Sequence, residues 1–345
     1  MSPKNLSVIK KNHKNLKNKL NNKRISKIYK KFESNCNLKK NFIVAVSGGA
    51  DSLALAFCAK IYSIKNKLNP KFFLIDHKLR SESTKEAKTV KQLLKKFSIN
   101  IEILTWKGKK PSNNISSLAR EKRYELLFKK CDKFKISNIL LGHHQDDLLE
   151  NFFIRVLRGS GLNGLVSLDK KNQIGNKNLL RPLLNEKKEN LIFLSKKVFN
   201  FYVKDPSNED EKSQRIRIRR LIQELQNNGL DKKKFIKTIH NLKYSNISSN
   251  YYVNENLKKN SFFSDKHNKM ILSKVFFDQP HEIVFRSLSE AIRIVGKKYY
   301  SARGKKLDKI INSIDNNDSL KATLGGCIIE KVNQTVIISK EYLKI

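Results

Sequence analysis

Short apolar runs alternate with segments of helical periodicity in the first half of the chain. The run at residues 42–46 stops at two glycines, after which Leu53, Phe57 and Ile61 recur at helical spacing. The predicted strands are residues 42–46, 72–75, 99–104 and 139–141. The predicted helices include residues 83–97, opened by a capping box of Ser83 and Glu86, residues 117–130, and a segment from near Gln145. Such alternation predicts an α/β fold with a parallel sheet, whose ligand lies beyond the carboxyl ends of the strands.

The rest of the chain has a different pattern on either side of this region. Residues 1–40 are polar and basic, and we expect a flexible arm or a loosely docked helix. Beyond residue 220, helices with Asn-rich connections are expected to about Leu272. Further helices are predicted at residues 282–295 and 304–314, and a terminal hairpin at 327–332 and 335–339 turns near Asn333. The predicted domains are residues 1–40 (basic extension), 41–220 (nucleotide domain), 221–275 (helical linker) and 276–345 (small α+β domain).

Charge narrows the class of partner. The 345 residues include 72 Lys and Arg against 31 Asp and Glu, a formal net charge of +41. This balance favours a polyanion, with nucleic acid first and an anionic membrane surface second. A genome that is rich in Lys and Asn codons is the other explanation.

Cysteine usage and hydropathy predict a soluble cytoplasmic protein. The four cysteines lie far apart without a C-x-x-C pair, which argues against a zinc knuckle, an iron–sulfur cluster or a disulfide framework. The N-terminus lacks the apolar segment of a signal peptide, and no stretch is long and apolar enough to span a bilayer.

A glycine-rich string separates the first strand from its helix. Its residues are Ser47, Gly48, Gly49, Ala50, Asp51 and Ser52. The glycines allow the backbone to approach phosphates, and the amides at the helix N-terminus face them. The string lacks the G-K-[ST] ending of a Walker A loop, so ordinary NTP hydrolysis is not favoured. A glycine turn with a capping Asp is the structural alternative.

This string resembles the S-G-G-x-D-S loop of the N-type ATP pyrophosphatases, and further strings are similar to the tRNA(Ile)-lysidine synthetase family. These strings are Asp76-His77-Lys78-Leu79-Arg80, Ala119-Arg120, Arg123-Tyr124, Gly142-His143-His144-Gln145-Asp146-Asp147 with Glu150, Arg158-Gly159-Ser160-Gly161, Arg181-Pro182-Leu183-Leu184 and Asp205-Pro206-Ser207-Asn208. The chain departs from the family pattern at Lys78, Leu148, Asn151 and Ile216. The resemblance implies an adenine nucleotide alpha hydrolase-like (PP-loop) domain.

An acidic string with two histidines begins the helix near Gln145. Read as a helix, it places His143, Asp147 and Asn151, and separately Asp146 and Glu150, at i, i+4. Carboxylates and ATP oxygens suit Mg²⁺, whereas zinc is disfavoured because no thiolate or H-E-x-x-H pattern is present. A solvated cluster at a helix start is the alternative.

Two arginine groups could contact phosphates. Arg120 and Arg123 fit either a phosphate clamp or a helix surface. Arg215, Arg217 and Arg219 alternate with isoleucines, which fits tRNA contact or a solvated face. The nearby G-x-G-x-x-G match at residues 159–164 follows a helix instead of a strand, so we discount it as a dinucleotide site.

The resemblance implies specific roles for these residues. Nucleotide binding falls to Ser47, Gly48, Gly49, Ala50, Asp51, Ser52, Asp76 and His77. Catalysis falls to Asp51, Arg120, His143, Asp146 and Asp147, with Asp51 and Asp147 near Mg²⁺ and the phosphates. Contacts with tRNA or the adenylate fall to Arg80, Arg123, Arg215, Arg217 and Arg219.

The implied activity is that of an RNA-modifying ligase. ATP adenylates C2 of the cytidine at the first anticodon position of tRNA-Ile (CAU), and the ε-amine of L-lysine displaces AMP. Another tRNA-modifying pyrophosphatase, of the 2-thiolase type, is the alternative enzyme, and a catalytically silent RNA-binding protein is the alternative of another class. A homodimer is compatible with the sequence.

Overall fold

The computed structural model describes residues 3–79, 81–106, 108, 115–203, 213–297, 304–316 and 319–341. The chain divides into two compact units, Met1–Lys237 and Thr238–Ile345. Each unit has its own sheet, and they are described separately.

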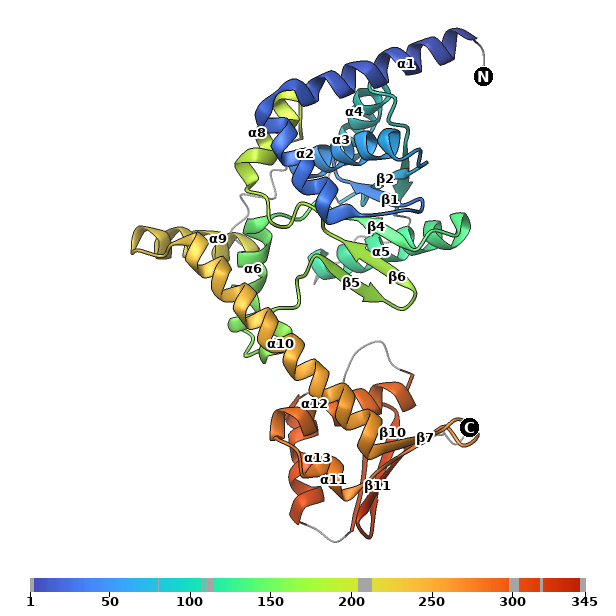
Figure 1. Ribbon diagram of the computed structural model, residues 1–345, viewed down its shortest axis with the longest axis vertical. Helices are drawn as coiled ribbons and strands as arrows, with labels where there is room; N and C mark the ends of the chain where they lie inside the picture. Colours follow the sequence, from blue (N-terminus) through green and yellow to red (C-terminus); the bar gives the residue numbers. More distant parts are fainter. Residues whose placement is uncertain are drawn as a thin grey trace. The chain divides into compact units, whose positions relative to one another are not determined.

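A six-stranded sheet forms the centre of the first unit, in the order β3-β2-β1-β4-β6-β5 (Figure 1). Its strands are β1 (Ile43–Val46), β2 (Lys71–Asp76), β3 (Ile101–Thr105), β4 (Asn138–Leu140), β5 (Lys171–Ile174) and β6 (Lys177–Leu180). All paired neighbours are parallel except β5 with β6. The predicted parallel α/β sheet is therefore confirmed. Strand order reverses direction between β1 and β4, which is where open α/β sheets bind ligands.

Helices cover both faces of this sheet because successive strand residues point to opposite sides. Ile43 and Phe73 pack in a cluster with Leu127 of α5 (Ile115–Phe134). Val44 and Leu74 pack in the larger cluster on the other face. The helices on that face are α3 (Ala50–Lys65), α4 (Ser83–Lys95) and α8 (Lys188–Phe199).

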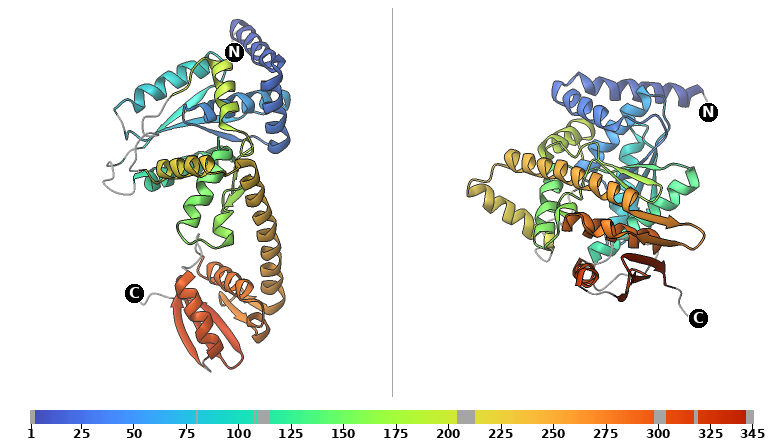
Figure 2. Two further views of the ribbon diagram at one scale, coloured as in Figure 1. Left: turned by 90° about the vertical axis from the view of Figure 1, so that its left-hand side faces the viewer. Right: turned by 60° about the horizontal axis from the view of Figure 1, so that its bottom comes forward.

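The helices before β1 pack against the larger cluster. They are α1 (Pro3–Asn18), a 3₁₀ turn (Lys19–Asn21) and α2 (Lys23–Cys36), which Figure 1 and Figure 2 show on the outer side of this helix layer. Ile25, Ile28 and Phe32 are buried in the core. The expected flexible or loosely docked arm is wrong for α2, because its apolar residues at i, i+3 and i+7 form one buried stripe.

Further helices of the first unit lie beyond β4 in the described part of the chain. They are α6 (Gln145–Val156), α7 (Leu162–Leu165), α9 (Gln214–Asn227) and the start of α10 (Lys232–Asn260). The glycine-rich string at residues 159–164 connects α6 to α7, which confirms the prediction that it follows a helix instead of a strand. Within the described ranges, no helix is both long enough and apolar enough to cross a membrane.

The second unit packs helices on a five-stranded antiparallel sheet, in the order β7-β8-β11-β10-β9. Its further elements are β7 (Ser261–Ser264), β8 (Lys269–Leu272), α11 (Lys274–Phe277), α12 (His281–Val295), α13 (Gly304–Asn316), β9 (Leu320–Leu324), β10 (Cys327–Val332) and β11 (Thr335–Lys340). The predicted hairpin is confirmed, and Asn333 turns it with φ of +54°. The expectation of helix to about Leu272 is wrong for β7 and β8. In β8, buried Met270 and Leu272 alternate with exposed neighbours, as in a half-buried strand.

Candidate active site

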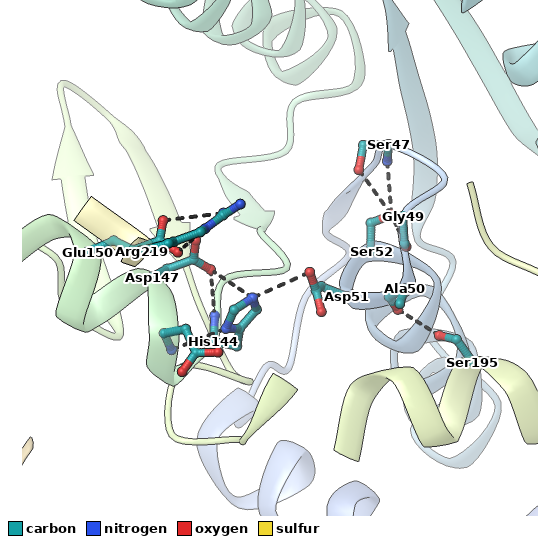
Figure 3. Close-up of polar contacts among 11 residues, drawn as sticks. Ser47, Gly49, Ala50, Asp51, Ser52, His144, Asp147, Glu150, Ser195 and Arg219 are labelled. Atoms are coloured by element: carbon teal, nitrogen blue, oxygen red, sulfur yellow. Dashed lines mark hydrogen bonds and ion pairs between the residues drawn. The ribbon is translucent and has the colours of Figure 1, made fainter. Parts of the chain in front are cut away.

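The phosphate loop, residues 47–52, leads from β1 into α3, and the side chain of Ser52 forms hydrogen bonds within it. The backbone N–H of Ser47 donates to Ser52 Oγ at 3.1 Å, and Ser52 Oγ donates to the carbonyl of Gly49 at 2.9 Å (Figure 3). Gly49 is the N-cap of α3 and supplies no side-chain cap. The first amides of α3 are therefore available to an anionic ligand.

Two glycines permit the close packing around this loop. Gly48 has φ of +87°, and a Cβ at this position would lie 2.8 Å from Cγ2 of Val90 in α4. Gly142 follows β4, and a Cβ there would lie 3.2 Å from the backbone of Asp51. Side chains at these two positions would disrupt the loop or separate it from the end of β4.

His144 connects the phosphate loop to the start of α6. Its Nε2 lies 3.4 Å from Asp51 Oδ2 and 3.5 Å from Asp147 Oδ2 (Figure 3). The same side chain caps α6, because Nδ1 accepts a hydrogen bond from the backbone N–H of Asp146 at 3.2 Å. In return, Asp147 Oδ2 accepts from the backbone N–H of His144 at 2.9 Å. The capping box and the Nε2 contacts together place the carboxylates of Asp51 and Asp147 on either side of His144, where strand order reverses.

The two adjacent histidines have opposite pKa shifts. Burial by itself would lower the pKa of His144, but the hydrogen bond with Asp51 and the charge of Asp147 raise it above its usual value. Burial holds the pKa of His143 well below its usual value, and the positive charge of Arg181 adds to the effect. His143 is therefore a neutral imidazole near pH 7, and its buried Nδ1 has no hydrogen-bond partner.

The structure corrects the predicted helical spacing of this string. Helix α6 begins at Gln145, so His143 and His144 both precede it, and His143 does not share a helix face with Asp147. Asp146 and Asp147 lie in the first turn, and Asp146 Oδ1 is 3.5 Å from Nζ of Lys232. Sequence reasoning missed His144 as a site residue, although the His-x-x-Asp spacing of a capping box could have indicated it.

Glu150, one turn further along α6, is buried and paired with Arg219 of α9. Arg219 Nε donates to Glu150 Oε1 at 2.6 Å. Burial raises the pKa of Glu150, and the Arg219 charge opposes that rise. The guanidinium that we predicted to contact tRNA thus also neutralises a buried carboxylate.

The predicted nucleotide residues after β2 differ in their surroundings. Asp76 Oδ1 accepts from Ser83 Oγ at 2.8 Å, and its Oδ2 accepts from Thr84 Oγ1 at 2.7 Å. The predicted capping box is therefore wrong, because Ser83 is the first helical residue and uses its hydroxyl on Asp76. Asp76 organises its loop, whereas both ring nitrogens of His77 are buried without partners. Arg80 lies outside the described residues.

The remaining predicted arginines occupy exposed helix positions. Arg120 and Arg123 lie near the start of α5, and Arg120 stacks over the Tyr124 ring with 5.2 Å to the centroid. Arg215 and Arg217 are exposed on α9, whose intervening isoleucines are buried. The string at residues 205–208 lies outside the described residues.

Arg181 is a buried cation that the site prediction omitted. It follows β6 at the carboxyl edge of the sheet and is 3% exposed. Nη1 donates to the carbonyl of Asp169 at 2.7 Å, while Nε is buried without a hydrogen-bond partner. Its place directly after the apolar pair Leu179 and Leu180, at the end of a strand, is the signal that could have identified it.

The residues of the site fit Mg²⁺ only if substrate phosphates supply some of its ligands. Within the described ranges, no group of three or more His, Cys, Asp or Glu side chains could hold a metal ion. Asp51 Oδ1 is buried without a hydrogen-bond partner, and Asp147 lies on the other side of His144. Mg²⁺ is commonly held by one or two carboxylates together with substrate phosphates, so Asp51 and Asp147 are suitable ligands.

Solved structures share the fold of part of this chain, and an archaeal tRNA thiolase is an example. It is the U34-tRNA thiolase NcsA from Methanococcus maripaludis with its 4Fe-4S cluster, at a TM-score of 0.54 and 16% identity. The similarity covers 64% of this chain and 78% of that one. At this identity the comparison supports the fold alone.

Sequence relatives are more specific. The family model of the PP-loop domain matches residues 17–225. The "tRNA(Ile)-lysidine synthase" of Wolbachia sp. subsp. Brugia malayi is 32% identical over 309 residues, which are 88% of this chain and 71% of the relative. The protein of the same name from Orientia tsutsugamushi is 34% identical over 87% of this chain and 69% of the relative. The chain therefore belongs to the tRNA(Ile)-lysidine synthase family of ATP-dependent PP-loop ligases.

Proposed function

We propose that this enzyme joins L-lysine to C2 of the cytidine at the first anticodon position of tRNA-Ile (CAU). ATP is consumed and AMP and pyrophosphate are released. One observation carries the proposal: the phosphate loop meets the acidic start of α6 through the 3.4 Å contact between Asp51 and His144. A phosphate-binding element and a proton-accepting element thus share the same edge of the sheet.

The first step joins the cytidine O2 atom to the α-phosphorus of ATP, and pyrophosphate leaves. The amides at the start of α3 and the hydroxyl of Ser47 are suitable donors to the phosphates. Mg²⁺ held by Asp51 and Asp147 would neutralise phosphate charge when bound. Adenylation is needed because the C2 oxygen is a poor leaving group until it carries a phosphoryl group.

The second step forms the bond between the lysine ε-nitrogen and C2, and AMP leaves with the O2 atom. The ε-amine must arrive deprotonated, because an ammonium has no lone pair. The neutral His143 can accept that proton, and the Asp146 carboxylate can hold the ammonium beforehand. Arg181 and Arg120 lower the pKa of His143 and are suited to the negative charge of the adenylate.

The tRNA substrate fits the exposed arginines and the overall charge. Arg215 and Arg217 lie on the exposed side of α9, and Arg120 and Arg123 on that of α5. With a formal net charge of +41, the protein should bind tRNA with an affinity that falls steeply as salt rises.

The 2-thiolase alternative receives less support from the cysteines. All four thiols are buried, and they belong to three separate core clusters. Burial raises the pKa of Cys36 to about 12 and that of Cys131 to about 11, and it also raises the pKa of Cys58. Sulfur transfer requires an accessible thiolate, which these environments disfavour.

The test is incubation of the enzyme with ATP, Mg²⁺, radiolabelled lysine and tRNA, followed by alkaline deacylation. We expect label that survives alkali, with AMP formed in equal amount. Pyrophosphate release without retained label would reject lysine as the nucleophile. Binding of tRNA with no pyrophosphate release would reject the ligase assignment for this chain.

A further inference from the structure

Helix α1 presents a basic face away from the protein. At about 100° per residue, Lys10, Lys11, Lys14 and Lys17 lie within an arc of about 120°. All four are exposed. Leu16, on the opposite side of α1, is buried, so the helix docks by one side and displays lysines on the other.

A second row of lysines lies on α4. Lys88, Lys91 and Lys95 are exposed and fall within an arc of about 60° on this helix. The two helices are linked where α4 ends, because Asn12 Nδ2 of α1 donates to Ser98 Oγ at 3.0 Å. The α1 and α4 lysines therefore belong to the same helix-covered side of the sheet (Figure 1).

This row leads toward the active site. Helix α4 begins at Ser83, whose hydroxyl is bonded to Asp76 at the carboxyl end of β2. Val90, halfway along α4, packs against Gly48 of the phosphate loop so closely that a Cβ at Gly48 would lie 2.8 Å from its Cγ2. From Ser83 to Lys95 the helix rises about 18 Å, so the lysine rows extend from beside the site to α1.

These lysines are not neutralised. Within the described ranges, none of the seven forms an ion pair with a carboxylate. Residues 1–40 contain 13 basic residues and a single acidic one, a far greater excess than the 72 to 31 of the whole chain. A general bias toward Lys codons does not account for this local excess, and unneutralised like charges repel unless a polyanion binds them.

We propose that the basic surface, defined as Lys10, Lys11, Lys14 and Lys17 of α1 with Lys88, Lys91 and Lys95 of α4, binds the phosphate backbone of RNA outside the active site. The family match begins at residue 17, so most of α1 lies outside the PP-loop domain. The contact is an addition to the catalytic domain that raises affinity without reading bases. That the RNA is tRNA rests on the proposed function, whereas backbone binding does not.

RNA fits this surface better than a lipid bilayer does. Helices that lie on membranes insert an exposed apolar face into the headgroup region. In α1, Leu16 is 1% exposed and faces the protein core, so it is not available for insertion. Among the α1 side chains that the structure describes, no exposed apolar residue accompanies the lysines, and such a surface is typical of phosphate-backbone contacts.

The experiment replaces Lys11, Lys14 and Lys17 with Gln in the full chain. A matched control replaces Lys129, Lys133 and Lys171 with Gln; these lysines are also exposed, and the first two lie on α5, which covers the other face of the sheet. A third variant replaces Lys11, Lys14 and Lys17 with Arg. Binding of a tRNA transcript is measured by fluorescence anisotropy over a series of KCl concentrations, without ATP or lysine.

We expect the Gln variant to bind tRNA about tenfold more weakly at low salt. Its slope of log affinity against log salt should become shallower by about 2, since each lost phosphate contact removes roughly 0.7 to 0.9. The Arg variant and the control should retain the wild-type slope, and turnover at saturating tRNA should be unchanged.

An unchanged slope in the Gln variant, or an equal loss in the control, would overturn the proposal. Loss of binding to phosphatidylglycerol vesicles with an unchanged tRNA slope would assign the surface to membranes and also overturn it. Because the binding measurement uses no ATP or lysine, its outcome does not depend on whether the ligase reaction occurs.

Discussion

The Nε2 atom of His144 lies 3.4 Å from Oδ2 of Asp51, although one residue follows β4 and the other lies in the first turn of α3. A single imidazole thus connects the phosphate loop to the helix that carries Asp146 and Asp147. The distance between the two halves of the site therefore depends on this side chain. We regard His144 as a positioning residue that fixes the carboxylates of Asp51 and Asp147.

Replacing His144 with Gln should separate these two roles. We expect pyrophosphate release to fall by about 10²-fold, since a small displacement of reacting groups has effects of that size. Affinity for tRNA should stay within about twofold of wild type. The control is His281→Gln, at a side chain that is 64% exposed in the second unit. Equal activity of His144→Gln and wild type would contradict a positioning role.

The raised pKa of His144 also predicts how stability depends on pH. A raised folded-state pKa contributes stability that is fully present below the unfolded-state value of about 6.5. That contribution is lost as pH rises through the folded-state pKa. The difference in unfolding free energy between wild type and His144→Gln should therefore shrink above pH 6.5, as measured by urea denaturation. A difference that grows with pH would reverse the assigned shift.

The strand, loop and helix around Asp51 could be predicted because the signals are local. An apolar run ends at Gly48 and Gly49, and helical spacing resumes directly afterwards. The contact between Asp51 and His144 could not be predicted, since it depends on β1 and β4 being neighbours. The helical pairing of His143 with Asp147 was wrong, because helical spacing applies only after a helix has begun and α6 begins at Gln145, with His144 as its N-cap.

Replacing Asp51 with Asn should abolish AMP formation and spare tRNA binding. The variant keeps the shape of the side chain but removes the negative charge that faces His144 and the phosphate loop. We expect a loss of at least 10²-fold in pyrophosphate release, with tRNA affinity unchanged at each salt concentration. The matched control is Glu102→Gln, which removes a carboxylate paired with Lys130 on the β3 side of the sheet. Comparable losses of tRNA binding and catalysis would show that Asp51 supports the fold instead.

His77 should weaken the fold in acid. Burial lowers its pKa to about 4, and the positive charge of Arg123 contributes. A histidine with a depressed folded-state pKa contributes stability above the unfolded-state value of about 6.5, and the contribution is lost as pH falls toward 4. His77→Gln should flatten this dependence by about 1 to 2 kcal/mol, as measured by urea denaturation between those pH values. An identical acid dependence in both proteins would reject the assignment.

The pair of Glu150 and Arg219 should behave as a unit. Arg219→Met leaves a buried carboxylate without its cation and should lower the free energy of unfolding by about 2 to 4 kcal/mol. Adding Glu150→Gln to that variant should restore most of the loss, because no buried charge is then left unpaired. Thermal and urea denaturation measure both variants. Purely additive losses would show that the two side chains do not interact.

The N-terminal helices and the first strands of the second unit were harder to predict for a shared reason. Lysine and asparagine are frequent around Phe32 in α2 and Met270 in β8. This polar composition obscured the helical spacing of apolar residues in α2 and their strand-like alternation in β8. The buried stripe of α2 becomes visible only when spacing is read without regard to composition. In this chain the many polar residues lie on the exposed faces of packed helices and strands, so a polar composition does not indicate that a segment is unpacked.

The most direct test of the account is the position of the new bond in tRNA. A tRNA-Ile (CAU) transcript is incubated with the enzyme, ATP, Mg²⁺ and lysine, digested to nucleosides and analysed by mass spectrometry. We predict one cytidine per tRNA whose mass increases by that of lysine less water, mapped to the first anticodon position and absent when Asp51→Asn replaces the wild type. An unmodified cytidine at that position, with pyrophosphate released, would contradict the proposed reaction.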